Sequence, residues 1–243
     1  MQARTWRPLL LGLILVLSSA GAFWPGINGG FFLDDFHNIV NNPRVHAESV
    51  DGSALINAIK AYNAGGSSRA LATVSFAINH ALGGLDPYGY KLTNIALHAL
   101  NVVLVFVLVR LLLANGILAG DKGRDVAAGL VALVWAAHPL QVSTVLYVVQ
   151  RMEILASTFV FLGLLTYLTG RLRQIEGRPG SGWLIAAVLL ASVGLLAKES
   201  AVIFIPICLA LELSLLQFRT GHGKPSKPLI WFYGTFFAIG LAV

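Results

Sequence analysis

Six long stretches of almost uncharged, apolar residues dominate this sequence. They cover approximately residues 8–24, 92–113, 126–146, 153–169, 183–198 and 200–217. A helix needs about 20 mostly apolar residues to cross the hydrocarbon core of a bilayer. Only 12% of the 243 residues are charged and 56% are hydrophobic, whereas roughly 25% of the residues of a soluble domain are charged. We therefore predict an all-α membrane protein, a polytopic bundle of six or seven transmembrane helices.

A seventh apolar stretch begins near Pro228 and extends to Val243. Its roughly 15 residues would form a helix about 22 Å long, which is shorter than a bilayer core. We expect residues 1–243 to form a single transmembrane domain that is incomplete at its C-terminal end. A tilted or re-entrant last segment is the alternative.

The placement of Lys and Arg predicts the orientation of the chain, because cationic loops near helix ends resist translocation. One group lies in alternate connections, which we assign to the cytoplasmic side together with the N-terminus: Arg4, Arg7, Arg110, Lys122, Arg124, Arg171, Arg173, Arg178, Arg219, Lys224 and Lys227. The remaining cations lie among acidic and histidine residues on the opposite side: Arg44, Lys60, Arg69, Lys91, Arg151 and Lys198. Because acidic and histidine residues accompany these cations, we predict that they have a chemical role on the outer, periplasmic side.

The segment between the first two stretches, residues 25–91, is long for a connection within a bundle and therefore predicts a folded or functional loop. Residues 53–62 and 69–82 have helical patterns, and we expect both helices to lie parallel to the membrane with their apolar faces toward lipid. The first stretch has a second interpretation as a cleavable signal peptide, because Arg4 and Arg7 precede it and small residues follow it.

Two adjacent acidic residues, Asp34 and Asp35, follow the first stretch. Adjacent side chains in an extended or turn segment diverge, so we expect one carboxylate to face a site and the other to bind backbone or a neighbouring cation. A solvated loop carboxylate and a helix N-cap, for which Asp is favoured, are the alternatives.

Ionisable residues recur at the predicted outer ends of the later helices: His138, Arg151, Glu153, Lys198 and Glu199. Charged groups at membrane depth are costly and usually face a protein interior or a wet cavity. Each could instead snorkel to the interface or form an ion pair that holds helices together. Because they converge on the side that carries Asp34, Asp35 and Arg69, we favour a shared functional site.

Other residues exclude several kinds of site. Cys208 is the single cysteine, so neither an internal disulfide nor a cysteine metal site can form. The sequence has no Lys/Arg run interleaved with aromatic residues, which excludes nucleic acid as a partner. Ser143 has no nearby arrangement that would make it a nucleophile. We interpret Glu212 and His80 as structural and Tyr147 as part of an aromatic interface belt.

Four motifs follow one another along the chain: LDDFHNIVNNP, SRALATVSFAINHALGGLDPYGYKLTNIALHALN, HPLQVSTVLYVVQRMEILAS and LLAKESAVIFIPICLALEL. In this order they resemble the membrane portion of bacterial tetratricopeptide-repeat glycosyltransferase-like proteins. These are similar to the eukaryotic transmembrane and tetratricopeptide repeat-containing O-mannosyltransferases of the GT-C superfamily. The resemblance implies a GT-C fold, a first outer loop with a catalytic aspartate and two membrane-parallel helices, and a polyprenyl-phosphate sugar as donor.

The resemblance also implies roles for individual residues. Asp34 and Asp35 match the family's acidic pair, and Arg69 matches the Arg of its Arg-Pro segment, although Ala70 follows here. A second departure is Ser143, which stands where relatives carry a Glu after the His-Pro pair. Further motif positions are matched by His138, Arg151, Glu153, Lys198 and Glu199.

These residue types suit transfer from a lipid phosphate. The leaving phosphate needs cations to neutralise it, for which the candidates are Arg69, His138, Arg151 and Lys198. The acceptor needs a general base, for which Asp34 or Asp35 is the candidate, and a single base opposite the leaving group predicts inversion at the sugar. Glu153 and Glu199 are candidates for orienting the site or for binding a divalent cation such as Mg²⁺ or Mn²⁺, which the sequence does not demand.

We therefore predict a hexosyltransferase of the bacterial inner membrane. It would transfer a sugar, with mannose as the candidate, from a polyprenyl-phosphate donor to a periplasmic protein or glycan acceptor. A noncatalytic membrane scaffold or lipid-binding protein and an inactive truncated remnant are the alternatives. A secondary transporter ranks lower, because transporter sites lie near the bilayer midplane.

Overall fold

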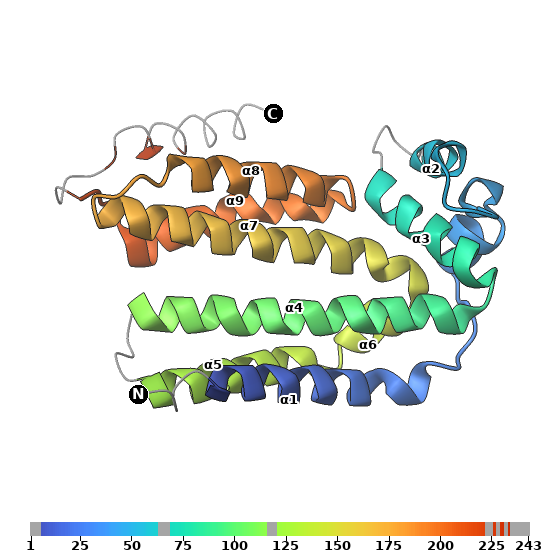
Figure 1. Cartoon of the computed structure of the whole chain (residues 1–243), viewed down its shortest axis with the longest axis horizontal. Coiled ribbons are helices and arrows are strands. Elements are labelled where there is room, and N and C mark those ends of the chain that lie inside the picture. Colours follow the sequence, from blue (N-terminus) through green and yellow to red (C-terminus); the bar gives the residue numbers. More distant parts are fainter. Residues whose placement is uncertain are drawn as a thin grey trace.

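The computed structural model describes residues 6–62, 69–115, 121–221, 226, 229–230 and 233. Within these ranges the chain forms helices and no β-strand. The long helices run side by side in an elongated bundle, and the chain passes back and forth along it (Figure 1). The prediction of an all-α membrane protein is confirmed.

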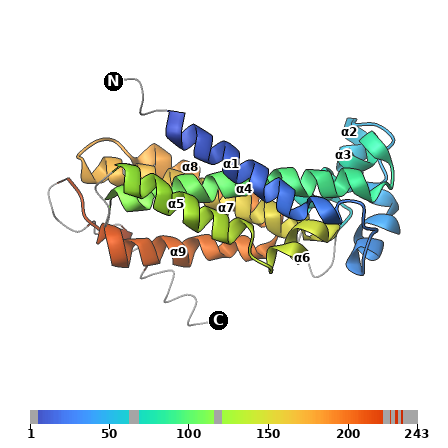
Figure 2. The same ribbon diagram turned by 90° about the horizontal axis from the view of Figure 1, so that it is seen from below.

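The centre of the bundle is formed by two neighbouring helices, α4 (Pro87–Asn115) and α7 (Arg151–Ile175). α1 (Trp6–Phe23) and α5 (Asp121–Ala136) pack on α4. α8 (Ser181–Leu195) and α9 (Phe204–Leu211) pack on α7, on the other side of the bundle (Figures 1 and 2).

Four helical segments of the described chain are long and apolar enough to cross a membrane: Trp6–Gly26, Pro87–Asn115, Val148–Ile175 and Glu199–Leu216. They correspond to four of the six predicted spans. The other two, α5 and α8, have 16 and 15 residues and are shorter. The start of a seventh span lies outside the described residues except for Leu229, Ile230 and Tyr233.

The predicted span 126–146 is not a single helix, which corrects the sequence interpretation. α5 ends at Ala136, and the short helix α6 (Gln141–Leu146) begins after a turn that contains Pro139. Proline has no backbone N–H and its ring clashes with the preceding helical turn, so it ends a helix that hydropathy alone would continue. The turn η5 (Val148–Gln150) then leads directly into α7.

The first loop contains two short turns, η2 (Phe36–Val40) and η3 (Pro43–Val45), and both of the helices that the sequence predicts. These are α2 (Gly52–Ile59) and α3 (Ala70–Gly83). Asp51 caps α2, since its Oδ1 accepts the backbone N–H groups of Ser53 and Ala54 at 2.9 Å each. Both helices lie at one end of the bundle, which we call the loop end (Figure 1).

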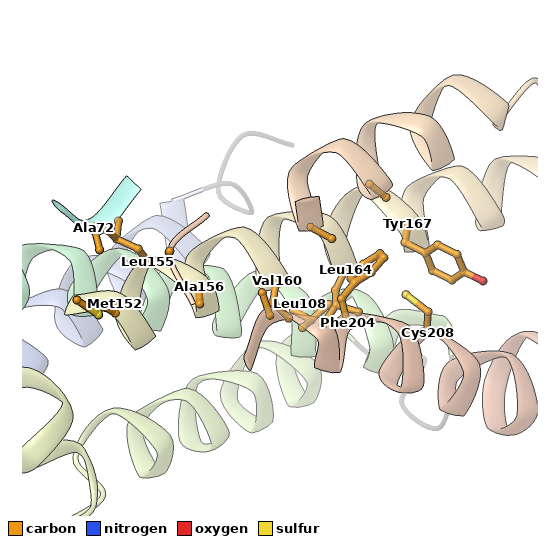
Figure 3. Packing of buried hydrophobic residues seen from close by; sticks show 14 of the residues in the cluster. Ala72, Leu108, Met152, Leu155, Ala156, Val160, Leu164, Tyr167, Phe204 and Cys208 are labelled. Carbon is orange, nitrogen blue, oxygen red and sulfur yellow. The ribbon is translucent and has the colours of Figure 1, made fainter. Parts of the chain in front are cut away.

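The core follows one face of α7. Figure 3 shows Met152, Val160 and Leu164 of α7 in a cluster that also contains Leu108 of α4 and Phe204 of α9. Lipid is as apolar as these side chains, so close packing and hydrogen bonds hold the helices together instead of the hydrophobic effect.

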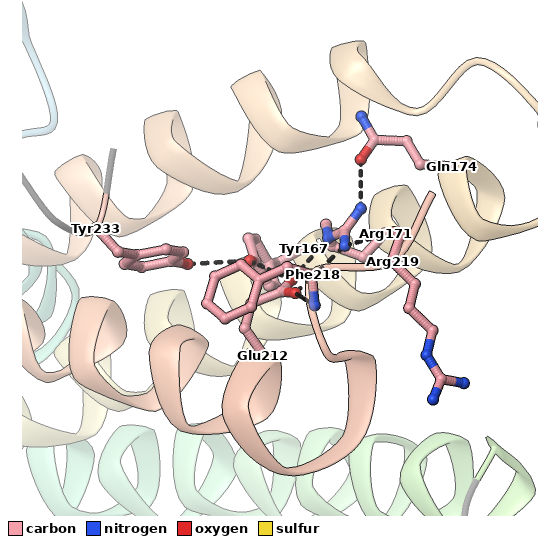
Figure 4. Close-up of polar contacts among 7 residues, drawn as sticks. All are labelled: Tyr167, Arg171, Gln174, Glu212, Phe218, Arg219 and Tyr233. Atoms are coloured by element: carbon pink, nitrogen blue, oxygen red, sulfur yellow. Dashed lines mark hydrogen bonds and ion pairs between the residues drawn. The ribbon is translucent and has the colours of Figure 1, made fainter. Parts of the chain in front are cut away.

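A buried ion pair joins α7 to the end of α9 far from the loop end. Arg171 Nε lies 2.6 Å from Glu212 Oε1, and both side chains are 0% exposed. Glu212 also accepts hydrogen bonds from the Tyr167 hydroxyl at 2.8 Å and from the Phe218 N–H at 2.9 Å. A further bond of 2.9 Å joins Tyr167 to Tyr233 (Figure 4). Glu212 is therefore structural, as its place in the sequence predicted.

Replacing Arg171 by Met should strongly destabilise the fold, because it leaves the Glu212 carboxylate buried without its cation. Removing one partner of a buried pair costs about 3–5 kcal/mol. Equilibrium unfolding in mixed detergent measures this loss. Arg178→Met is the matched control, since the pair of Arg178 with Glu176 is exposed; equal stability in the two variants would contradict the structural role of Arg171.

Candidate active site

Asp35 is a buried anchor. Its side chain is 0% exposed, and each carboxylate oxygen accepts a backbone N–H: Oδ2 from Phe32 at 3.0 Å and Oδ1 from Val149 at 2.7 Å. Burial raises the pKa of Asp35, while these hydrogen bonds and the nearby Lys91 ammonium act in the opposite direction. The residue thus joins the first loop to the start of α7.

Asp34 faces the other way. It is exposed, its backbone N–H donates to the Tyr147 hydroxyl at 2.7 Å, and its carbonyl accepts from Asn38 Nδ2 at 2.8 Å. Leu33, just before it, has a φ of 42°, a left-handed backbone that non-glycine residues rarely adopt. The two aspartates therefore differ: the carboxylate of Asp35 is buried and holds the loop, whereas Asp34 is exposed.

Four charged residues form two ion pairs at the loop end, and we call them the charged quartet: Arg69, Glu153, Lys198 and Glu199. Lys198 Nζ lies 2.6 Å from Glu153 Oε1, and Arg69 Nη2 lies 2.8 Å from Glu199 Oε1. The Ser200 hydroxyl donates to the other oxygen of Glu153 at 2.6 Å. The quartet joins the residue before α3, the first turn of α7 and the turn between α8 and η6 (Glu199–Ile203).

Arg69 is held firmly but keeps hydrogen-bonding capacity. Its guanidinium lies over the Tyr62 ring, 4.4 Å from the centroid, and its Nη1 donates to Met152 Sδ at 3.2 Å, a weak acceptor. Within the described part of the chain, Arg69 Nε has no hydrogen-bond partner. This nitrogen is itself buried, whereas Nη2 donates to Glu199 Oε1 at 2.8 Å in an exposed hydrogen bond.

Arg151 does not join the quartet, although the sequence placed it there. It is 0% exposed, and its guanidinium donates to Asn94 Oδ1 at 2.7 Å, to the Tyr90 carbonyl at 2.8 Å and to the Ser75 carbonyl at 3.1 Å. It also lies over the Phe76 ring at 4.9 Å. These contacts occupy its donors inside the junction of α3, α4 and α7, so they do not place it against a donor phosphate.

His138 also lies apart. It is exposed in the break between α5 and α6, and its Nδ1 accepts the Leu140 N–H at 3.3 Å. It lines a hollow formed mainly by apolar residues, among them Leu130, Val134 and Trp135. The described residues that line this hollow include no Lys or Arg that could join His138 in binding a phosphate.

Glu153 and Glu199 are paired with the basic side chains of Lys198 and Arg69 in this structure. Among the described residues, no three His, Cys, Asp or Glu side chains come together as metal ligands. Each carboxylate is instead engaged with a basic residue of the quartet. A divalent cation at this place would have to compete with Arg69 and Lys198.

An apolar groove lies beside the quartet, between α8 and α9. Its volume is about 450 Å³, and its lining extends from Leu195, Ala201 and Val202 to Tyr167 and Tyr233. Lys198 lies in the turn between the two helices, only three residues from either Leu195 or Ala201 in the chain. The quartet is therefore adjacent in sequence to residues that line the groove, although no quartet residue is itself part of that lining.

Sequence reasoning missed two aromatic residues of the site. Tyr147 binds the backbone of Asp34, and Tyr62 supports Arg69. Tyr147 lies four residues before Arg151 in one of the motifs, yet an interfacial tyrosine and a hydrogen-bonding one have the same sequence signature. Only the fold of the first loop brings Asp34 to it.

Fold and site together define a polytopic helical membrane protein with ion pairs beside an apolar groove at its loop end. The sequence is 30% identical over 210 residues to human protein O-mannosyl-transferase TMTC4, covering 81% of this chain and 28% of that protein. It is 34% identical over 136 residues to human TMTC2, covering 56% and 15%. It is 32% identical over 189 residues to Drosophila melanogaster Tmtc1, covering 75% and 20%.

The resemblance predicted from the four motifs is thus confirmed: the sequence is related to the protein O-mannosyl-transferases. The chain spans less than a third of the length of each of these relatives. No family model matches the sequence. No solved structure matches it.

The two aspartates should differ in their effect on stability. Asp35→Asn replaces one acceptor oxygen by an N–H donor that faces a backbone N–H, which should cost about 1–3 kcal/mol. Asp34→Asn should leave the unfolding transition unchanged, because its carboxylate is exposed. Thermal unfolding of both variants measures the difference, and an equal loss in the two would contradict the anchor role of Asp35.

Proposed function

We propose that the chain is the membrane-embedded part of a glycosyltransferase of GT-C type. It transfers a sugar, with mannose as the candidate, from a polyprenyl-phosphate donor to a protein or glycan acceptor. Its site faces the periplasm of a bacterial inner membrane, with the N-terminus in the cytoplasm. The relatives named protein O-mannosyl-transferases support the sugar transfer and the protein acceptor.

The observation that carries the proposal is the charged quartet, in which Lys198 lies three residues from both Leu195 and Ala201 of the groove lining. A polyprenyl phosphate has an anionic head and a long apolar chain. Arg69 and Lys198 offer charge-assisted hydrogen bonds to the head, and the groove between α8 and α9 offers an apolar surface to the chain. The ligand enters laterally from the bilayer, where its chain is already dissolved.

Phosphate binding exchanges one anion for another. In the structure Glu199 and Glu153 neutralise Arg69 and Lys198. The phosphate oxygens take the place of these carboxylates, and the cations then stabilise the charge that grows on the phosphate as the glycosidic bond breaks. The leaving phosphate departs with the bonding electron pair, so no strong general acid is needed.

Asp34 is the general base in this proposal, because its carboxylate is exposed while that of Asp35 is engaged with backbone. The acceptor hydroxyl attacks the anomeric carbon opposite the phosphate and passes its proton to Asp34. The bond to the acceptor oxygen forms as the bond to phosphate breaks, so the configuration at the sugar is inverted. No step requires a metal ion.

Transfer activity tests this assignment. Full-length chain in proteoliposomes should move radiolabelled mannose from polyprenyl-phosphate mannose to serine- and threonine-containing peptides. Asp34→Asn should lower kcat by a factor of about 10²–10⁴, the usual contribution of a general base, without unfolding the protein. An Asp34→Asn variant with full activity would exclude Asp34 as the base.

Donor binding tests the groove separately. Polyprenyl phosphate without a sugar should raise the unfolding temperature, because a ligand of the folded state stabilises it. Ser192→Trp, at an exposed position of the groove lining, should abolish this rise. Leu9→Trp on the exposed face of α1 is the matched control; a rise of wild-type size in Ser192→Trp would contradict the groove assignment.

A noncatalytic scaffold is the rival function, and the pairing of all four quartet charges favours it. In a scaffold the pairs would hold the first loop to the bundle. Lys198→Ala should then lower the free energy of unfolding and leave the binding of polyprenyl phosphate unchanged. In the enzyme Lys198→Ala should stay folded and raise the KM for the donor. Unfolding and kinetics of this one variant separate the two functions.

A further inference from the structure

Two hydrogen bonds clamp the Asp34–Asp35 dipeptide onto residues 147–149. In one, the Val149 N–H donates to the Asp35 carboxylate at 2.7 Å. In the other, the Asp34 N–H donates to the Tyr147 hydroxyl at 2.7 Å. The first bond uses the side chain of its aspartate, whereas the second uses the backbone N–H of Asp34. The Asp34 carboxylate also contacts the Tyr147 hydroxyl and is exposed.

Tyr147 is itself held in place. Its ring contacts the Phe32 ring edge to face, with centroids 6.0 Å apart. Phe32 in turn donates its N–H to Asp35, so the ring contact and both clamp bonds close one circuit. Burial raises the pKa of Tyr147, and the neighbouring charges of Asp34 and Asp35 act in the same direction.

The backbone between these contacts is strained. Leu33 has a φ of 42°, and a non-glycine residue in the left-handed region persists only where the surrounding structure holds it. The Phe32 and Asp34 contacts lie on either side of Leu33. Without the Tyr147 bond, the turn is free to relax and to carry the Asp34 carboxylate away from its position.

We propose that Tyr147 is a positioning residue: its hydroxyl fixes the backbone of Asp34 so that the Asp34 carboxylate faces the acceptor. The proposal rests on the proposed function for its catalytic consequence, but its structural claim stands on geometry alone. Tyr147 acts through Asp34 and does not touch the reacting atoms.

Hydrogen exchange resolved to single amides tests the structural claim without any substrate. In Tyr147→Phe the ring and its contact with Phe32 remain, and only the hydroxyl, with its contacts to Asp34, is lost. The Asp34 amide should exchange roughly tenfold faster than in wild type, as expected for the loss of one hydrogen bond. Tyr88→Phe, on an exposed face near the start of α4, is the control. Unchanged protection of the Asp34 amide in Tyr147→Phe would overturn the proposal.

Kinetics test the catalytic consequence. Tyr147→Phe should lower kcat by about tenfold to a hundredfold, since small displacements of a reacting group have effects of this size. The KM for the donor should stay unchanged, because the donor contacts are at the quartet. In an Asp34→Asn background, Tyr147→Phe should have no further effect on kcat, as expected when one residue acts through the other. A merely structural residue would lower activity equally in both backgrounds, and that result would overturn the proposal.

The failures of the two proposals are distinguishable. If wild-type chain transfers no sugar, the proposed function fails, and the exchange of the Asp34 amide alone decides whether Tyr147 holds it. If wild-type chain transfers sugar and Tyr147→Phe has the kcat of wild type, the positioning role is wrong and the proposed function stands.

Discussion

The buried guanidinium of Arg151 is the constraint on which the loop end depends. A charge without partners inside a membrane protein would cost several kcal/mol, so Arg151 must keep its acceptors. These are supplied by α3, through the Ser75 carbonyl, and by α4, through Asn94 and the Tyr90 carbonyl. The first loop is therefore docked on the bundle at a fixed place. Because Met152 and Glu153 follow Arg151 in α7, the contacts to Arg69 and Lys198 are fixed with it.

Hydropathy was sufficient to predict the helical bundle and the long first loop, because burial in lipid needs only long apolar runs. The two helices of that loop were predicted from their helical periodicity instead. It could not predict the break at Pro139, since that depends on a single backbone group within an apolar run. The motifs brought the quartet residues to attention, but Arg69 and Arg151 have the same charge in the sequence. Only the fold shows that one is partly exposed and the other is enclosed by neutral acceptors. Similarly, the acidic pair predicted divergent side chains, while the choice between Asp34 and Asp35 needed the position of Val149.

The two kinds of ion pair in this chain provide an internal comparison. Arg171 and Glu212 are both 0% exposed and surrounded by further hydrogen bonds (Figure 4). If either side chain moved away, the charge of the other would stay buried without a partner. Such a pair serves as a fixed joint between helices. In the pair of Arg69 and Glu199 the exposure is unequal: 17% for the cation and 61% for the carboxylate. The carboxylate can turn into solvent at little cost, whereas Tyr62 and Met152 keep the cation in place.

This inequality favours anion exchange over a purely structural role for the pair of Arg69 and Glu199. A pair that only held the loop would gain most from shielding both partners from water, because exposed pairs contribute little to stability. A pair that must yield its cation to a phosphate needs the opposite: an oriented cation and a carboxylate that is easily displaced. The backbone contact from the Leu71 N–H to the Leu196 carbonyl, 3.0 Å long, joins α3 to the end of α8 independently of Glu199. In the proposed function this contact would keep the loop docked when the carboxylate leaves, so that the cation would meet the phosphate in the position it already occupies.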